Sequence, residues 1–179
     1  MIPVETTNPL TLAEDGKAEY GKGNFKAAAA LFAQAAQAYA ALQDELNAAE
    51  MKNNESVAWL QAGKAQQALD ATDGTEEIFI KAGDLKRQGI AVSNRAAALE
   101  GLKKWKDSLA EYDRAASLLE QAGEGDMHSM VRKAAANLNL KRGRINDSQM
   151  DVYDSLRLVE KPSLTQRMMK FLMKIGLIR

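Results

Sequence analysis

The chain has 179 residues, and its 24 lysines and arginines balance 24 aspartates and glutamates, with one histidine and no cysteine. This length predicts one domain, since domains commonly hold about 100–200 residues. The absence of cysteine excludes disulfides, thiolate zinc sites and cysteine nucleophiles, and it favours an intracellular, cytoplasmic protein. The first ten residues lack the features of a secretory signal, and no stretch is long and apolar enough for a membrane-spanning helix.

The charges are distributed unevenly along the chain. Residues 1–100 carry 9 basic and 14 acidic residues, residues 101–160 carry 10 of each, and residues 161–179 carry five basic residues and no acid. The acidic first half argues against a nucleic-acid partner, which requires a basic surface. An acidic first half and a basic end also permit head-to-tail self-association.

Proline occurs only at positions 3, 9 and 162, so no proline interrupts a helix between residues 10 and 161. That span is rich in alanine, leucine, glutamate, lysine and glutamine, which favour helices. After a flexible arm at residues 1–9, we expect helices at 10–22, 25–42, 46–62, 65–82, 85–102, 105–122, 127–142, 145–159 and 163–177. The helix at 65–82 is expected to kink or break at Gly74, because glycine inside a helix costs about 1 kcal/mol relative to alanine.

The sequence repeats with a period of 40 residues. Two positions in each unit hold small residues, which are Gly16, Ser56, Ala96 and Ala136, and Ala28, Ala68, Ser108 and Ser148. We interpret each unit as two antiparallel helices that approach closely at these positions, with large side chains such as Phe32 and Tyr112 filling the remaining space. Glycine is expected to close the turns, because positive φ is cheap only for glycine, and a following residue such as Asp84 caps the next helix.

This pattern resembles the tetratricopeptide repeat (TPR). The first unit carries the resemblance best, in GKAEYGKGNFKAAAALFAQAA, with signature positions at Gly16, Gly23, Phe25, Ala28, Phe32 and Ala35. The period exceeds the usual ~34 residues and is similar to the lengthened repeats of the soluble NSF attachment proteins and of some bacterial regulators, and the sequence alone assigns the chain to neither group.

The resemblance implies an all-α, right-handed superhelical solenoid of four TPR-like hairpins at residues 10–44, 45–84, 85–124 and 125–160, followed by a basic amphipathic C-terminal helix at 161–179. It further implies a non-enzymatic adaptor or scaffold that binds a protein partner, either a peptide or a helix.

Polar residues on the first helices of the repeats are candidates for a partner-binding groove on the concave face. They are Asn53, Asn54, Ser93, Asn94, Lys133 and Asn137. Asparagine is a poor residue for helix interiors, so its recurrence suggests a binding role, and an ordinary solvated helix surface is the equal alternative. A carboxylate clamp, as in TPR domains that bind chaperone tails, is disfavoured because Ala13 and Lys17 occupy its first-repeat positions.

No catalytic, cofactor-binding or metal-binding constellation is found in the sequence. His128 is the single histidine, and we expect it on the surface, in the turn before the fourth repeat. Glu76 and Glu77 are neighbours that a helix directs about 100° apart, so a solvated helix face is expected there.

The C-terminal segment combines an apolar stripe with a strip of basic residues. The residues expected to contact a partner or a membrane are Arg167, Met168, Lys170, Phe171, Leu172, Lys174 and Ile175. Three interpretations remain open: the helix caps the last repeat, it docks into a partner, or residues 163–179 lie on an anionic membrane surface. The last would make the protein a peripheral membrane-associated assembly factor tethered by this helix.

Overall fold

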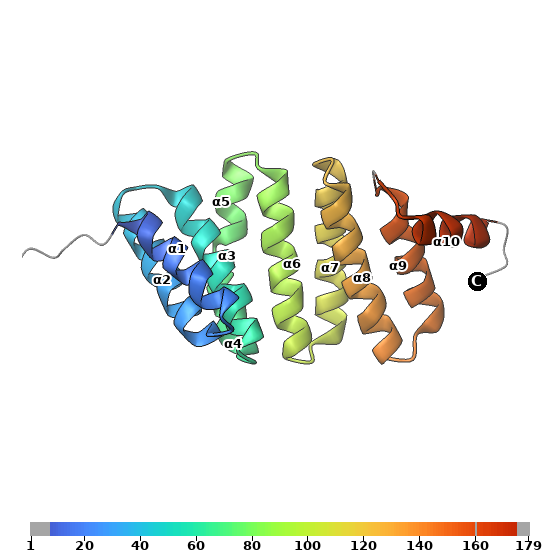
Figure 1. Ribbon diagram of the computed structural model, residues 1–179, viewed down its shortest axis with the longest axis horizontal. Helices are drawn as coiled ribbons and strands as arrows, with labels where there is room; N and C mark the ends of the chain where they lie inside the picture. The colour runs from blue at the N-terminus through green and yellow to red at the C-terminus, as the bar shows by residue number, and fades with distance from the viewer. Residues whose placement is uncertain (1–7, 160, 175–179) are drawn as a thin grey trace, which may run out of the picture.

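A computed structural model describes residues 8–159 and 161–174, and these residues form ten α-helices and no strand. The helices are α1 (Pro9–Gly21), α2 (Phe25–Ala41), α3 (Glu45–Gln61), α4 (Ala65–Ala71), α5 (Thr75–Lys81), α6 (Leu85–Gly101), α7 (Trp105–Gln121), α8 (Gly125–Lys141), α9 (Ile145–Arg157) and α10 (Leu164–Lys174). Figure 1 shows α1 to α9 side by side in one row of hairpins, with α1 and α10 at opposite ends. The predicted all-α helical-repeat fold is confirmed. Residues 1–7 of the predicted arm lie outside the described residues.

The turns between helices follow one pattern. A residue with positive φ lies in each turn from α1 to α9, and it is glycine in most of them, as at Gly63 (φ 71°). Gln43 and Lys103 adopt the same conformation, with φ of 60° and 61°. Asp44 and Asp84 then cap α3 and α6 by accepting hydrogen bonds from backbone N–H groups three residues on, at 3.1 and 2.9 Å. These turns set the antiparallel direction of each hairpin.

Small residues allow the two helices of each hairpin to approach closely. All eight of the predicted small positions are buried. A Cβ atom on Gly16 would lie 2.8 Å from the ring of Phe32, which therefore fills the space that the glycine leaves. In the next hairpins the contact is polar, because Ser56 Oγ donates to the carbonyl of Ala68 at 2.7 Å and Ser108 Oγ donates to the carbonyl of Ala96 at 2.9 Å.

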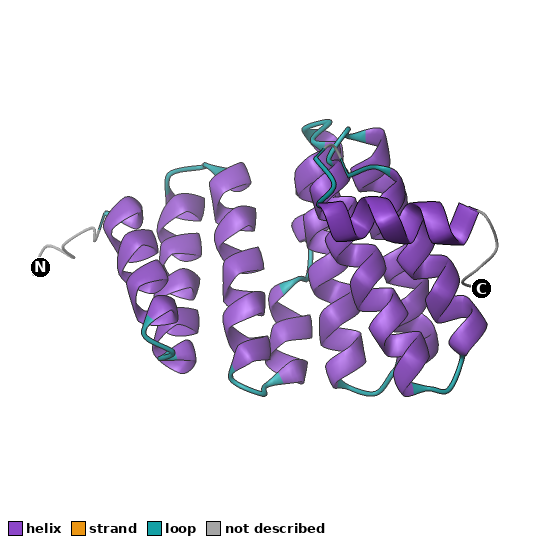
Figure 2. Ribbon diagram, turned by 45° about the vertical axis from the view of Figure 1, so that its right-hand side comes forward, coloured by secondary structure: helices purple, strands orange, loops and turns teal. Residues whose placement is uncertain are grey.

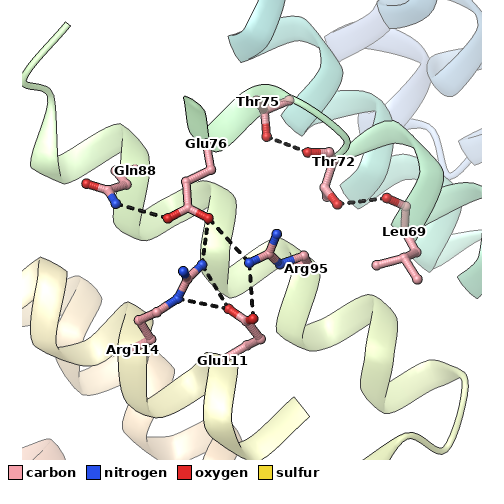
Figure 3. Close-up of polar contacts among 8 residues, drawn as sticks. All are labelled: Leu69, Thr72, Thr75, Glu76, Gln88, Arg95, Glu111 and Arg114. Carbon is pink, nitrogen blue, oxygen red and sulfur yellow. Dashed lines mark hydrogen bonds and ion pairs between the residues drawn. The ribbon is translucent and has the colours of Figure 1, made fainter. Parts of the chain in front are cut away.

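The second hairpin differs from the others because its second helix is interrupted. Gly74 has φ 72° and separates α4 from α5, at the position where the sequence predicts a break. Thr72 Oγ1 donates to the carbonyl of Leu69 at 2.7 Å, and Thr75 Oγ1 donates to the carbonyl of Thr72 at 2.8 Å (Figure 3). Such local bonds offer the backbone an alternative to continuing the helix.

The apolar core is divided at this interruption. One large cluster of buried residues lies between residues 12 and 58, and a second lies between residues 92 and 138. Between them is a small cluster of Ala49, Phe79 and Ala91. The joint between the second and third hairpins therefore contains less apolar packing than either half.

Candidate functional site

The last helix, α10, begins with a capping box. Ser163 N donates to Gln166 Oε1 at 2.7 Å, and Gln166 N donates to Ser163 Oγ at 3.3 Å. Two backbone N–H groups at the start of the helix are thereby satisfied. Both ribbon views show α10 crossing the direction of α9 (Figures 1 and 2), and α9 is its main packing neighbour.

The α10 stripe, which consists of Leu164, Met168 and Phe171, faces away from the rest of the protein. These side chains are 83%, 56% and 60% exposed. Because they are spaced three and four residues apart, they lie on one face of the helix. The structure thus presents an apolar face that is more than half exposed at each of its three side chains.

The opposite side of α10 contacts the solenoid. Gln166 and Lys170 are half-buried there, and Lys170 Nζ donates to the carbonyl of Arg157 at 3.2 Å. Met150 and Tyr153 on α9 remain exposed. As a cap, α10 therefore covers the last hairpin with its more polar side. Of the other predicted contact residues, Arg167 is exposed and Leu172 is half-buried, whereas the side chains of Lys174 and Ile175 lie outside the described residues.

Three of the six predicted groove residues line one hollow of about 500 Å³ between α3 and α6, which we call the α3–α6 hollow. These are Asn53, Asn54 and Asn94. Ser93 does not line the hollow, and its Oγ donates to the carbonyl of Ile90 in its own helix at 2.8 Å. Lys133 and Asn137 are exposed on α8, farther along the row.

Both cations that line the α3–α6 hollow, Lys86 and Arg87, are paired with carboxylates. Arg87 lies between two carboxylates, 3.2 Å from Asp84 and 3.7 Å from Glu50. Lys86 pairs with Glu124 at 2.8 Å. Among the described residues that line it, the hollow therefore has no free cation, and two carboxylates share Arg87.

Glu76 contradicts the expectation of a solvated surface. It is only 7% exposed and lies at the start of α5. Its Oε2 atom is 2.6 Å from Arg114 Nη2 and 3.3 Å from Arg95 Nη2, and its Oε1 accepts from Gln88 at 3.0 Å (Figure 3). Glu111 completes the network by pairing with both arginines. Burial disfavours the carboxylate, but the hydrogen bonds from Gln88 and Arg114 and the charges of both arginines outweigh it and lower the pKa of Glu76.

The repeat register indicates that position 76 is buried, although a glutamate is usually exposed. Position 76 corresponds to Ala36, Ala116 and Leu156 in the other units, and all three are buried. Glu77 is exposed, as predicted. The network joins α5 to α6 and α7, so it links the two halves of the core across the joint.

The prediction that His128 lies on the surface is wrong. His128 lies within α8 and is fully buried. Its Nε2 atom is 3.4 Å from Asp154 Oδ2, and neither ring nitrogen has a hydrogen-bond partner among the described residues. Burial lowers the pKa of His128; Asp154 and Glu120 oppose this effect, while Arg132 and Arg157 add to it. The repeat register gives no clear signal, because the corresponding positions are the buried Ala48, the half-buried Gln88 and the exposed Asn8.

Acidification is expected to destabilise the protein through His128. The pKa of His128 in the fold lies below the usual 6.5. Between these two pKa values the unfolded chain binds a proton more readily than the folded protein does. The free energy of unfolding therefore falls as the pH falls from 6.5 to the lower pKa. The slope is at most about 1.4 kcal/mol per pH unit. Thermal unfolding at pH 7.5 and 5.5 should show a larger loss for the wild type than for His128→Leu. Equal losses would contradict this assignment.

Among residues 8–159 and 161–174, no three histidine, cysteine, aspartate or glutamate side chains gather closely enough to hold a metal ion. Within the same ranges, no helix combines the length and apolar character needed to cross a membrane.

No curated protein matches this chain. The family model for soluble NSF attachment protein, SNAP, matches residues 21–178, which include every helix from α2 to α10. Because this match covers most of the chain, the protein belongs to the SNAP family, whose members are non-enzymatic adaptors that bind proteins.

Proposed function

We propose that this adaptor binds its partner protein through the α10 stripe, with the α3–α6 hollow as a second contact. The exposed stripe is the observation that supports the proposal most directly. The family name identifies NSF as the protein to which members attach, and SNARE complexes are the other partners of the family. We therefore propose an NSF-type ATPase and a SNARE-type helical complex as partners of this chain.

The chemistry of α10 suits a protein partner. Burying a leucine, methionine or phenylalanine side chain contributes about 1.5–3 kcal/mol, and methionine adapts to irregular surfaces. An amphipathic helix commonly docks by laying residues with this spacing into a groove of its partner. Arg167, which is exposed beside the stripe, would add attraction to an acidic rim.

A triple variant of the full chain, Leu164→Ser, Met168→Ser and Phe171→Ser, tests the stripe. We expect binding to a purified NSF-type ATPase with an assembled SNARE complex to weaken by about 100-fold or more, from the lost apolar burial. Isothermal titration calorimetry measures the affinity. The melting temperature should stay close to that of the wild type, because these side chains are exposed.

The matched control is Met150→Ser with Tyr153→Ser, which removes exposed apolar side chains from α9. This variant should bind like the wild type. Unchanged affinity in the triple variant, or equal losses in both variants, would contradict the role of the stripe.

A membrane surface is the alternative partner, and the charge of this segment favours it. Residues 161–179 contain five basic residues and no acid, beside an exposed apolar stripe. Near an anionic surface each basic residue contributes about 1 kcal/mol. Co-sedimentation with vesicles of phosphatidylcholine, with and without phosphatidylserine, tests this alternative. Binding only to the anionic vesicles, and its loss in Lys161→Gln with Arg167→Gln, would favour the membrane over the ATPase complex.

A further inference from the structure

The turns within the hairpins lie along one edge of the row, and the turns between hairpins lie along the other. The two helices of each hairpin are antiparallel, so the chain reverses at alternate edges. Figures 1 and 2 show the turns from α3 to α4, α6 to α7 and α8 to α9 along the same edge, and Figure 1 shows the turn from α1 to α2 there as well. We call it the hairpin-turn edge, and it consists of residues 21–26, 61–66, 101–106 and 141–146.

The hairpin-turn edge is basic throughout its length. Its four segments contain nine lysines and arginines and no aspartate or glutamate. All nine are exposed, and they are Lys22, Lys26, Lys64, Lys103, Lys104, Lys106, Lys141, Arg142 and Arg144. The turns between hairpins, at 41–46, 81–86 and 121–126, carry five acidic and two basic residues. The zero net charge of the chain therefore conceals two edges of opposite sign.

Most of the positive charge on this edge is not neutralised within the chain. Among the described residues, three of the nine cations form ion pairs and the other six form none. The three pairs are Lys22 with Glu19, Lys141 with Glu100, and Arg144 with Asp147. Asp107, which is exposed directly after the third segment, offsets one further charge. The edge therefore keeps a surplus of positive charge that faces solvent.

Helix stability does not account for the placement of these cations. Lys64, Lys104 and Arg144 occupy the N-cap positions of α4, α7 and α9, and none of them makes a capping hydrogen bond. An N-cap normally holds serine, threonine, aspartate or asparagine, and a cation there faces the positive end of the helix dipole. At the opposite edge, the N-caps of α3 and α6 are Asp44 and Asp84. The recurrence of a cation in this unfavourable position favours binding of an anionic ligand.

The shape and composition of the edge suit a flat anionic surface. The four segments repeat every 40 residues and form one row, so a planar surface meets the solenoid at successive hairpins. Seven of the nine cations are lysines. Lysine acts as a point charge without the fixed two-pronged geometry of arginine, which suits lipid headgroups that have no fixed arrangement. Ile145 is also exposed on this edge, and an apolar side chain beside cations can enter the headgroup region.

We infer that the hairpin-turn edge binds an anionic membrane surface through its lysine and arginine side chains. Each cation that reaches such a surface strengthens binding about fivefold. The inference goes beyond the proposed function and does not depend on it. The α10 helix follows the end of α9 and so starts from the opposite edge, and the α10 stripe takes no part in this contact.

A triple variant of the full chain, Lys103→Gln, Lys104→Gln and Lys106→Gln, tests the edge by co-sedimentation with vesicles of phosphatidylcholine and phosphatidylserine. We expect the affinity for these vesicles to fall about 100-fold. The wild type should not bind vesicles of phosphatidylcholine alone, and rising salt should weaken its binding to the anionic vesicles. The melting temperature should not fall, because the three side chains are exposed and Gln43 already adopts the backbone conformation of Lys103.

The matched control is Lys52→Gln with Lys81→Gln and Lys133→Gln. These three lysines are exposed and lie outside the hairpin-turn edge, so the control removes the same charge from other surfaces. It should bind the anionic vesicles like the wild type. Equal losses in the two triple variants would overturn the inference, since they would show that only the net charge of the protein matters.

Lys161→Gln with Arg167→Gln separates this edge from the C-terminal segment. Loss of vesicle binding in that variant, with full binding by the variant of residues 103, 104 and 106, would overturn the inference and assign the membrane contact to residues 161–179. Binding of the wild type to soluble poly-L-glutamate but not to the anionic vesicles would also overturn it, in favour of an acidic protein. The ATPase assay contains no lipid, so failure of this inference is distinguishable from failure of the proposed function.

Discussion

Replacing Glu76 by alanine is expected to lower the free energy of unfolding by about 3 kcal/mol, because removal of one member of a buried ion-pair network leaves its partners uncompensated. Arg95 and Arg114 would lose the carboxylate that joins them, and Gln88 would lose its acceptor. Both arginines are partly exposed, so water can take up some of the loss and the effect should lie at the low end of those seen for buried pairs. Urea denaturation of the full chain measures it.

Glu77→Ala is the matched control for this experiment. Glu77 is the next residue along α5 and is exposed, so its replacement should change stability by no more than about 0.5 kcal/mol. Similar losses in the two variants would show that Glu76 has no special role.

The pH dependence provides a second test of the same network. Because the pKa of Glu76 is lowered in the fold, its ionised form contributes stability that is fully present above the usual 4.5 and is lost as the pH falls through the lower value. The difference between the wild type and Glu76→Ala should therefore shrink below pH 4.5. A constant difference down to pH 3 would mean that Glu76 acts by packing rather than by charge.

Features that depend on local geometry could be predicted from the sequence. The turn at Gly63 follows from the conformational freedom of glycine, and the break at Gly74 follows from the same property inside a helix. The close approach at Gly16 follows from the repeat register, since every unit has a small residue there. These signals are local or repeat in phase, so one sequence is enough to read them.

Features that depend on distant partners could not be predicted in the same way. Glu76 is compensated by Arg95 and Arg114, which lie 19 and 38 residues further along the chain. Residue type alone predicted a solvated carboxylate, and only the structure places the two arginines beside it. His128 is a similar case, because it is fully buried in α8 with Asp154 of α9 3.4 Å away, although a single histidine is usually exposed.

In the candidate site, too, the sequence predicts local features but not those that depend on tertiary packing. The spacing of Leu164, Met168 and Phe171 predicts an apolar stripe, but the angle at which α10 leaves α9 decides which way the stripe faces. Asn53 and Asn94 share a hollow because α3 and α6 are neighbours, whereas the sequence placed Lys133 in the same groove. The periodicity of apolar residues identifies one face of a helix, and tertiary packing decides whether that face contacts another helix or solvent.

Replacing Gly125 by alanine is expected to destabilise the protein by about 1–3 kcal/mol, although alanine normally favours a helix over glycine. A Cβ atom on Gly125 would lie 2.1 Å from the carbonyl oxygen of Leu158, which is backbone and cannot rotate away. Leu158 caps the end of α9, so the start of α8 and the end of α9 must separate. Urea denaturation measures the loss of stability, and hydrogen exchange should show reduced protection in α9.

Gly21→Ala is the control, and it should change the stability in the opposite direction. Gly21 ends α1 with no heavy atom within 4 Å of the position of a Cβ, so alanine should stabilise the protein there by about 0.5–1 kcal/mol. The contrast extends to the proposed function, because α10 follows Leu158 closely and is oriented by the end of α9. Gly125→Ala should therefore weaken binding to the ATPase complex even where the protein remains folded, whereas Gly21→Ala should not. If both variants bind like the wild type, the orientation of α10 by α9 does not contribute to partner binding.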